Sequence, residues 1–150
     1  MILALDTALR TGWCLLKDGK VYESGVQDFS KKRGESNGAV FLRFRAWLGR
    51  MLDMDIKFVI YEQVFPRGQA AKEIAANLTG RVQEECTARN IEYACVYSTT
   101  LKKWATGSGK AEKPAMIARA RDILHRDPVD DNEADAVLLG MLAFEEYGVK

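Results

Sequence analysis

The chain has 150 residues, of which 47% are hydrophobic, and its 22 basic and 21 acidic residues leave a formal net charge of +1. This length suits one domain with a substantial core and is short for two. Because the charge is nearly balanced, no global field favours nucleic acid, and such a partner would have to be bound by local clusters.

The cysteine content and hydropathy indicate the compartment. Cys14, Cys86 and Cys95 are odd in number and lack metal-ligand spacing, so we expect reduced thiols that all act as small hydrophobic core residues. No charged segment precedes a signal-like apolar run, and no apolar run is long enough to cross a bilayer. We therefore expect a soluble, cytoplasmic protein without a membrane partner.

The first part of the chain is predicted to form an antiparallel meander. Met1 to Leu5 are strand-forming apolar residues, and Asp6 adds a carboxylate at the carboxyl end of this strand. Two further strands are expected over Thr11–Leu16 and Val21–Asp28. They are joined by the sequence KDGK, in which Asp18-Gly19 favours a tight hairpin.

The rest of the chain alternates helices and strands after a polar loop, SKKRGESNG. A helix is expected from about Ala39 to Leu52, followed by a strand that ends at Glu62. A helix over Gln69–Arg89 and a strand over Ile91–Tyr97 come next. The chain then forms a short helix, a helix from near Pro114 to about His125, and a last helix in DDNEADAVLLGMLAFEEYG. This order predicts an α/β fold with one five-stranded mixed sheet flanked by helices, in a single domain over residues 1–150.

Carboxylates occur where two apolar strands end, at Asp6 and at Glu62. If these strands pair in parallel, both carboxylates lie at the sheet edge where open α/β folds bind ligands. In the last helix, Asp131 and Asp135 share a face, and Asn132 lies close to it. Two alternatives involve no site: Asp6 starts a turn, or Asp131 stabilises a helix N-terminus. Asp135 fits the second alternative poorly because it lies past the first helical turn.

Three or four converging carboxylates cannot all stay ionised without a compensating cation. Oxygen ligands favour Mg²⁺ or Mn²⁺, whereas the one histidine and three cysteines lack the spacing of a zinc site. Two such ions about 4 Å apart would clamp a phosphodiester and activate a water for in-line attack.

Four segments, LALDTALRTGW, VIYEQVF, LKKWATGSGKAEK and DNEADAVLLG, resemble the RuvC family of Holliday junction resolvases in order and spacing. The similarity spans nearly the whole chain, and the chain's compactness resembles phage-type members. The resemblance implies an RNase H-like fold and a metal-dependent endonuclease that resolves four-way DNA junctions by paired symmetric nicks. The resemblance also implies a homodimer in the cytoplasm of a bacterial or phage-infected cell. It does not say whether a helicase is a partner.

The resemblance implies catalytic, metal-binding carboxylates at Asp6, Glu62 and Asp135, plus a fourth at the start of the last helix. The commonest family pattern has two aspartates three residues apart, but here Asn132 stands three before Asp135, with Asp131 beside it. Either Asp131 reaches the metal from one turn back, or Asn132 contributes an amide oxygen; we favour Asp131. The site would bind two Mg²⁺ ions, with Mn²⁺ as a substitute.

The resemblance also suggests which residues contact DNA. Lys113, counted among the catalytic residues, and Lys102 match lysines near the scissile phosphate, although solvated surface lysines are the ordinary alternative. Phe65 matches a wedge that stacks on bases of an opened junction, the alternative being a core residue. The expected DNA-binding residues are Phe65, Arg67, Lys102, Lys103, Lys110 and Lys113.

The helix over Gln69–Arg89 is the expected dimer element, with Ile74, Leu78 and Val82 at helical spacing; ordinary packing on the sheet is the alternative, and the two roles are compatible. Two other functions remain open at this point. One is a nuclease of the same fold that acts on other branched DNA or on RNA precursors, and the other is a catalytically silent junction-binding module.

Overall fold

Five strands form one mixed sheet in the computed structural model, which describes residues 1–148. β1 (Ile2–Asp6), β2 (Arg10–Lys17) and β3 (Lys20–Asp28) form the antiparallel meander, while β4 (Phe58–Gln63) and β5 (Glu92–Tyr97) continue the sheet in parallel to β1. The strand order is β3-β2-β1-β4-β5. The expected five-stranded mixed sheet and the parallel pairing of β1 with β4 are confirmed.

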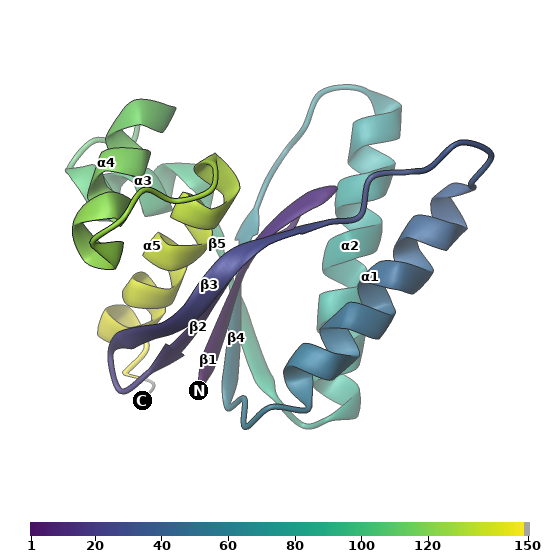
Figure 1. Cartoon of the computed structure of the whole chain (residues 1–150), viewed down its shortest axis with the longest axis horizontal. Helices are drawn as coiled ribbons and strands as arrows, with labels where there is room; N and C mark the ends of the chain where they lie inside the picture. Colours follow the sequence, from purple (N-terminus) through teal and green to yellow (C-terminus); the bar gives the residue numbers. More distant parts are fainter. Residues whose placement is uncertain (149–150) are drawn as a thin grey trace.

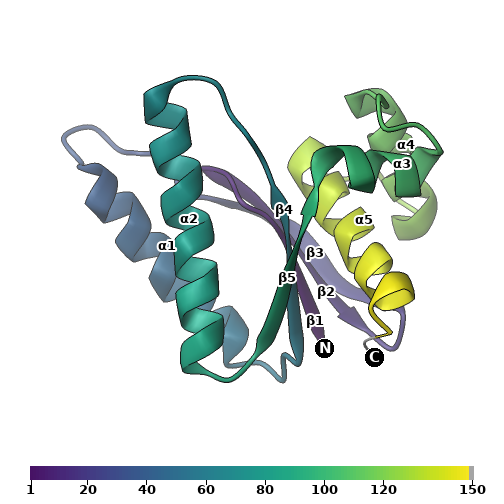
Figure 2. The ribbon, with the colours of Figure 1, turned by 180° about the vertical axis from the view of Figure 1, so that it is seen from behind.

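Helices cover both faces of this sheet (Figure 1). α1 (Asn37–Leu52) and α2 (Gln69–Ala88) lie on one face, and α3 (Ser98–Thr106), α4 (Lys113–Leu124) and α5 (Asp131–Glu146) gather on the other, as the view from behind also shows (Figure 2). The helices begin and end close to the expected positions. No helix within residues 1–148 has the length and hydrophobicity needed to cross a membrane.

The continuous apolar sequence of β1 follows from its burial on both faces. Leu3 and Leu5 belong to the core beneath α1 and α2, whereas Ile2 and Ala4 belong to the core beneath α5. A central strand that is covered on both sides has no solvent face, so its residues do not alternate between apolar and polar. Asp6 is the first polar residue of this strand, and it faces the side on which α5 lies.

Local chemistry explains the hairpin between β2 and β3. Asp18 and Gly19 have φ angles of 51° and 77°, so both adopt the left-handed conformation of a tight hairpin turn. Aspartate and glycine tolerate this conformation better than most residues. The hairpin expected from the KDGK sequence is therefore confirmed.

Two expectations about buried residues need correction. Cys14 and Cys86 are buried as expected, but Cys95 is exposed because β5 is an edge strand with incomplete cover. On α2, Leu78 and Val82 pack fully buried in the core, with Ile74 partly buried beside them. Leu78 and Val82 therefore pack on the sheet and are not available to a dimer contact, whereas Ile74 is only partly covered.

Candidate metal centre

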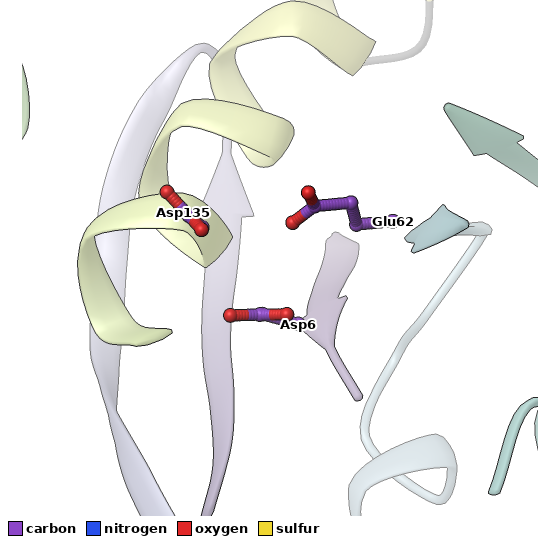
Figure 3. A group of neighbouring side chains, drawn as sticks. All are labelled: Asp6, Glu62 and Asp135. Atoms are coloured by element: carbon purple, nitrogen blue, oxygen red, sulfur yellow. The ribbon is translucent and has the colours of Figure 1, made fainter. Parts of the chain in front are cut away.

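Three of the expected carboxylates converge at the carboxyl edge of the sheet. Asp6, Glu62 and Asp135 each place one carboxylate oxygen within 4.8 Å of the other two. Figure 3 shows the three side chains pointing toward one another from β1, β4 and α5. The parallel register pairs Leu5 with Tyr61, so Asp6 and Glu62 follow on adjacent strands and face the same side. We name Asp6, Glu62 and Asp135 the carboxylate trio.

Two members of the carboxylate trio are buried, and the third, Asp135, is partly buried. Asp6 and Glu62 are only 7% and 6% exposed, and none of the ion pairs within residues 1–148 includes a member of the trio. Burial and then the charge of Glu62 raise the pKa of Asp6 well above its usual range. The same two causes raise the pKa of Asp135 to about 7. Such a cluster of oxygen ligands fits a hard divalent cation.

A contact between Gly12 and α5 positions Asp135. Gly12 lies opposite Asp6 in the β1–β2 pairing, and a Cβ atom added to it would lie 1.9 Å from the backbone oxygen of Asn132. Real Cβ atoms do not approach a carbonyl oxygen this closely, so only glycine permits this contact. The first turn of α5 can therefore lie directly against β2, and Asp135 follows one turn later.

Polar contacts hold the start of α5 in the same place. Asp130 caps the helix by accepting hydrogen bonds from the backbone amides of Asn132 and Glu133. Arg10 of β2 donates to the same carboxylate, with Nη2 at 3.1 Å from Oδ2. Glu133 is fully buried and accepts hydrogen bonds from Arg126 and from Ser24 of β3, each at 2.6 Å. These bonds fix α5 against two strands of the sheet.

Ser98 is a contact of the carboxylate trio that sequence analysis missed. Its hydroxyl donates to Oε1 of Glu62 from the first position of α3, directly after β5. Burial raises the pKa of Glu62, while this hydrogen bond and the charge of Lys102 act in the opposite direction. The rule that brings Asp6 and Glu62 together would also have found Ser98, because β5 runs parallel to β4 and ends at the same edge.

An open cavity of about 560 Å³ adjoins the carboxylate trio. Its charged lining comprises Glu62, Asp131, Asp135, Lys102, Lys110, Glu112 and Lys113. Asp131 lies outside the trio and forms an ion pair with Lys113, at 3.3 Å from Nζ. The side-chain amide of Asn132 instead donates to Asp130, at 3.4 Å.

The remaining expected DNA-binding residues lie outside this cavity. Lys103 lines a different hollow, with Trp104 and Tyr147, so α3 presents Lys102 and Lys103 to different surroundings. Phe65 is 77% exposed, which excludes the core alternative, and Arg67 lies exposed in the same loop between β4 and α2. A cavity of about 630 Å³ between β3 and the end of α4 includes no member of the trio.

Comparison with known proteins shows the fold of the chain. No family model and no curated protein matches its sequence. The structure of Thermus thermophilus RuvC aligns with a TM-score of 0.78 and 17% identity, over 98% of this chain and 96% of that chain. The T. thermophilus RuvC in complex with a Holliday junction substrate aligns with a TM-score of 0.78 and 18% identity, over 93% and 90%. The chain therefore has the RuvC-like, RNase H-like fold that its motifs predicted.

Proposed function

We propose that this chain is a metal-dependent endonuclease that resolves four-way DNA junctions by paired symmetric nicks. The observation that carries the proposal is the carboxylate trio, which is largely buried, forms no ion pair within residues 1–148 and lies at the carboxyl edge of a RuvC-like sheet. Branched DNA is supported as the substrate because a RuvC of the same fold forms a complex with a Holliday junction substrate.

Asp6, Glu62 and Asp135 would hold the divalent ions, which we propose to be two Mg²⁺, with Mn²⁺ as a substitute. When bound, such ions activate a water and stabilise the attacking and leaving oxygens of an in-line phosphodiester hydrolysis. Ser98 holds Glu62 by its hydrogen bond, and the contact of Gly12 with Asn132 fixes the helix that carries Asp135.

Asp131 is our proposed fourth ligand because it lines the same cavity as Glu62 and Asp135. Asn132 is the weaker candidate, since its side chain contacts Asp130. Asp131→Asn should then reduce cleavage more than Asn132→Ala does.

Lys102, Lys110 and Lys113 provide positive charge in the cavity, where an oxygen-rich phosphodiester would lie. Lys113 pairs with Asp131 in this structure and would exchange that carboxylate for a non-bridging phosphate oxygen when DNA binds. Phe65 would act as the wedge at the junction centre, with Arg67 beside it in the loop.

Two symmetric nicks require two active sites, so we propose a homodimer that acts in the cytoplasm of a bacterial or phage-infected cell. Since Leu78 and Val82 are buried, α2 could contribute only its outward face, which includes Ala76 and Gly80.

The proposal is tested by incubating the chain with a mobile four-way DNA junction and Mg²⁺. We expect nicks at symmetric positions of two opposing strands, none with Asp135→Asn, and little cutting of linear duplex. Binding without cutting in both Mg²⁺ and Mn²⁺ would favour a silent junction-binding module. Equal cutting of other branched DNA or of RNA precursors would favour a broader nuclease.

A further inference from the structure

Two exposed aromatic rings stack on each other close to the carboxyl edge of the sheet. The ring centroids of Phe65 and Tyr97 lie 5.9 Å apart with an angle of 21° between the planes. Phe65 is 77% exposed and Tyr97 is 55% exposed, so the pair is not part of the core. Large aromatic faces left open to water are suited to a binding partner with a flat apolar surface.

The strand register relates this pair to the carboxylate trio. Tyr97 ends β5 opposite Gln63, while the neighbouring residue pair is Glu62 with Val96. Side chains alternate along a strand, so Tyr97 points away from the face to which Glu62 points. The next residue, Ser98, donates its hydrogen bond to Glu62. The aromatic pair and the trio therefore occupy opposite sides of one sheet edge.

The separation along the chain is short enough for one DNA strand to contact both. Phe65 follows Glu62 by three residues, so their Cα atoms are at most about 10 Å apart. A few nucleotides of one strand span this distance, since the duplex rises by roughly 3.4 Å along its axis for each nucleotide. A strand whose phosphate lies at the trio would thus bring a nearby base within reach of the Phe65 ring.

Phe65 needs support to present a fixed surface to such a base. Its loop, residues 64–68, lies between β4 and α2, whereas Tyr97 belongs to a strand that β4 pairs along its whole length. A ring held flat on a rigid neighbour loses less conformational freedom when a ligand stacks on its other face. Tyr97 supplies that neighbour.

We infer that Tyr97 is a positioning residue that holds the Phe65 ring as a two-ring platform for one unpaired nucleobase at the opened centre of the junction. The inference rests on the proposed function and adds Tyr97 to it. Every base has a π-face, so the platform binds bases of any sequence. Exposed Arg67, two residues after Phe65, provides a cation for the adjoining phosphate.

The test compares Tyr97→Ala, Tyr97→Phe and Tyr93→Ala on intact junctions and on junctions that carry unpaired bases at the centre. Tyr93 is the matched control, because it precedes Tyr97 by four residues on β5, faces the same side and is also exposed. Tyr97→Ala should slow cleavage of the intact junction about three- to tenfold and leave cleavage of the opened junction unchanged. Tyr97→Phe and Tyr93→Ala should behave as the unaltered chain.

A second arm needs no cleavage and follows the fluorescence of 2-aminopurine placed at the centre of the intact junction. The unaltered chain and Tyr97→Phe should change the fluorescence as the base leaves its stack, and Tyr97→Ala should change it less. Combining Tyr97→Ala with Phe65→Ala should add nothing to Phe65→Ala alone, because Tyr97 acts through Phe65.

Equal effects of Tyr97→Ala on both substrates, additive losses in the double variant, or an unchanged fluorescence response would overturn the inference. Failure of the proposed function is distinguishable, because the unaltered chain would then cut neither junction while the fluorescence arm still reports on the platform.

Discussion

Two carboxylates, fully buried Glu133 and partly buried Asp135, lie two residues apart on α5 and have opposite surroundings. Glu133 accepts hydrogen bonds from Arg126, Ser24 and the backbone amide of Val129. Burial alone would raise the pKa of Glu133, but these bonds outweigh burial and hold it below its usual range. Asp135 faces Glu62 and Asp131 instead, and burial with those charges raises its pKa to about 7.

The difference separates a carboxylate that serves the fold from one that is kept for a ligand. Where a buried charge joins elements together, the chain supplies its own cation, as Arg126 does for Glu133. Where a metal cation from solution is to neutralise the carboxylates, the chain supplies no ion-pair partner within residues 1–148, as at the carboxylate trio. Single substitutions of Glu133 and of members of the carboxylate trio test this comparison.

The largest contrast is expected between neutral variants of the two residues. Asp135→Asn should abolish junction cleavage but leave the metal-free fold intact, since it removes repulsion from Glu62 and Asp131. Glu133→Gln should lower the free energy of unfolding by about 1–3 kcal/mol, because it weakens the charge-assisted hydrogen bonds that buried Glu133 accepts from Arg126 and Ser24. Cleavage assays and chemical denaturation measure both effects.

Asp6→Asn and Glu62→Gln should behave as Asp135→Asn does and should still bind the junction, because phosphate contacts dominate affinity. Full cleavage by any of these three variants would contradict the assignment of the trio.

The pH dependence of stability should differ between the unaltered chain and Asp135→Asn without metal. The folded state raises the pKa of Asp135 from 3.8 to about 7, so the folded chain holds this proton more tightly than the unfolded chain. The associated stability is present below the unfolded value and is lost as the pH rises through about 7. The stability of Asp135→Asn relative to the unaltered chain should therefore grow over this range, as thermal unfolding in a chelator would show. A pH-independent difference would mean that Asp135 is not protonated in the metal-free fold.

Gly12→Ala should disturb the trio without changing any charge. Its Cβ would overlap the backbone oxygen of Asn132 and push the first turn of α5 away from β2. We expect a loss of about 1–3 kcal/mol in unfolding free energy and weaker metal binding. Gly80→Ala on α2 is the control, because its added Cβ meets no atom and should slightly stabilise the helix. Normal metal affinity in Gly12→Ala would show that α5 can shift without moving Asp135.

The smallest expected effect concerns Ser98. Ser98→Ala removes the hydrogen bond that orients Glu62 and should weaken Mn²⁺ binding about tenfold, with little change in stability. Ser108→Ala is a suitable control, since Ser108 lies in the loop before α4 and contacts no member of the trio. Equal Mn²⁺ affinity for the two variants would show that Ser98 does not contribute to metal binding.

Periodicity and strand endings predicted much of the fold and the positions of Asp6 and Glu62. The reason is that both carboxylates end apolar strands, and strands of this kind pair in parallel at the centre of an α/β sheet. The prediction that Cys95 lies in the core was wrong, because the local sequence of β5 does not indicate that this strand lies at the edge of the sheet.

Contacts between distant segments could not be predicted in the same way. The pairing of Arg10 with Asp130 and the approach of Asn132 to Gly12 each join residues about 120 positions apart. They depend on how α5 packs across the sheet, and no local pattern encodes that packing. The stack of Phe65 on Tyr97 likewise follows from the β4–β5 register and not from either residue alone.

The most direct test of the central claim is calorimetric titration of Mn²⁺ into the metal-free chain at about pH 6, in two buffers with different ionisation enthalpies. We predict saturable binding accompanied by proton release, because raised carboxyl pKa values mean that the metal has to displace protons. Asp135→Asn should bind far more weakly and release fewer protons. Absence of binding, or binding that Asp135→Asn leaves unchanged, would contradict the account.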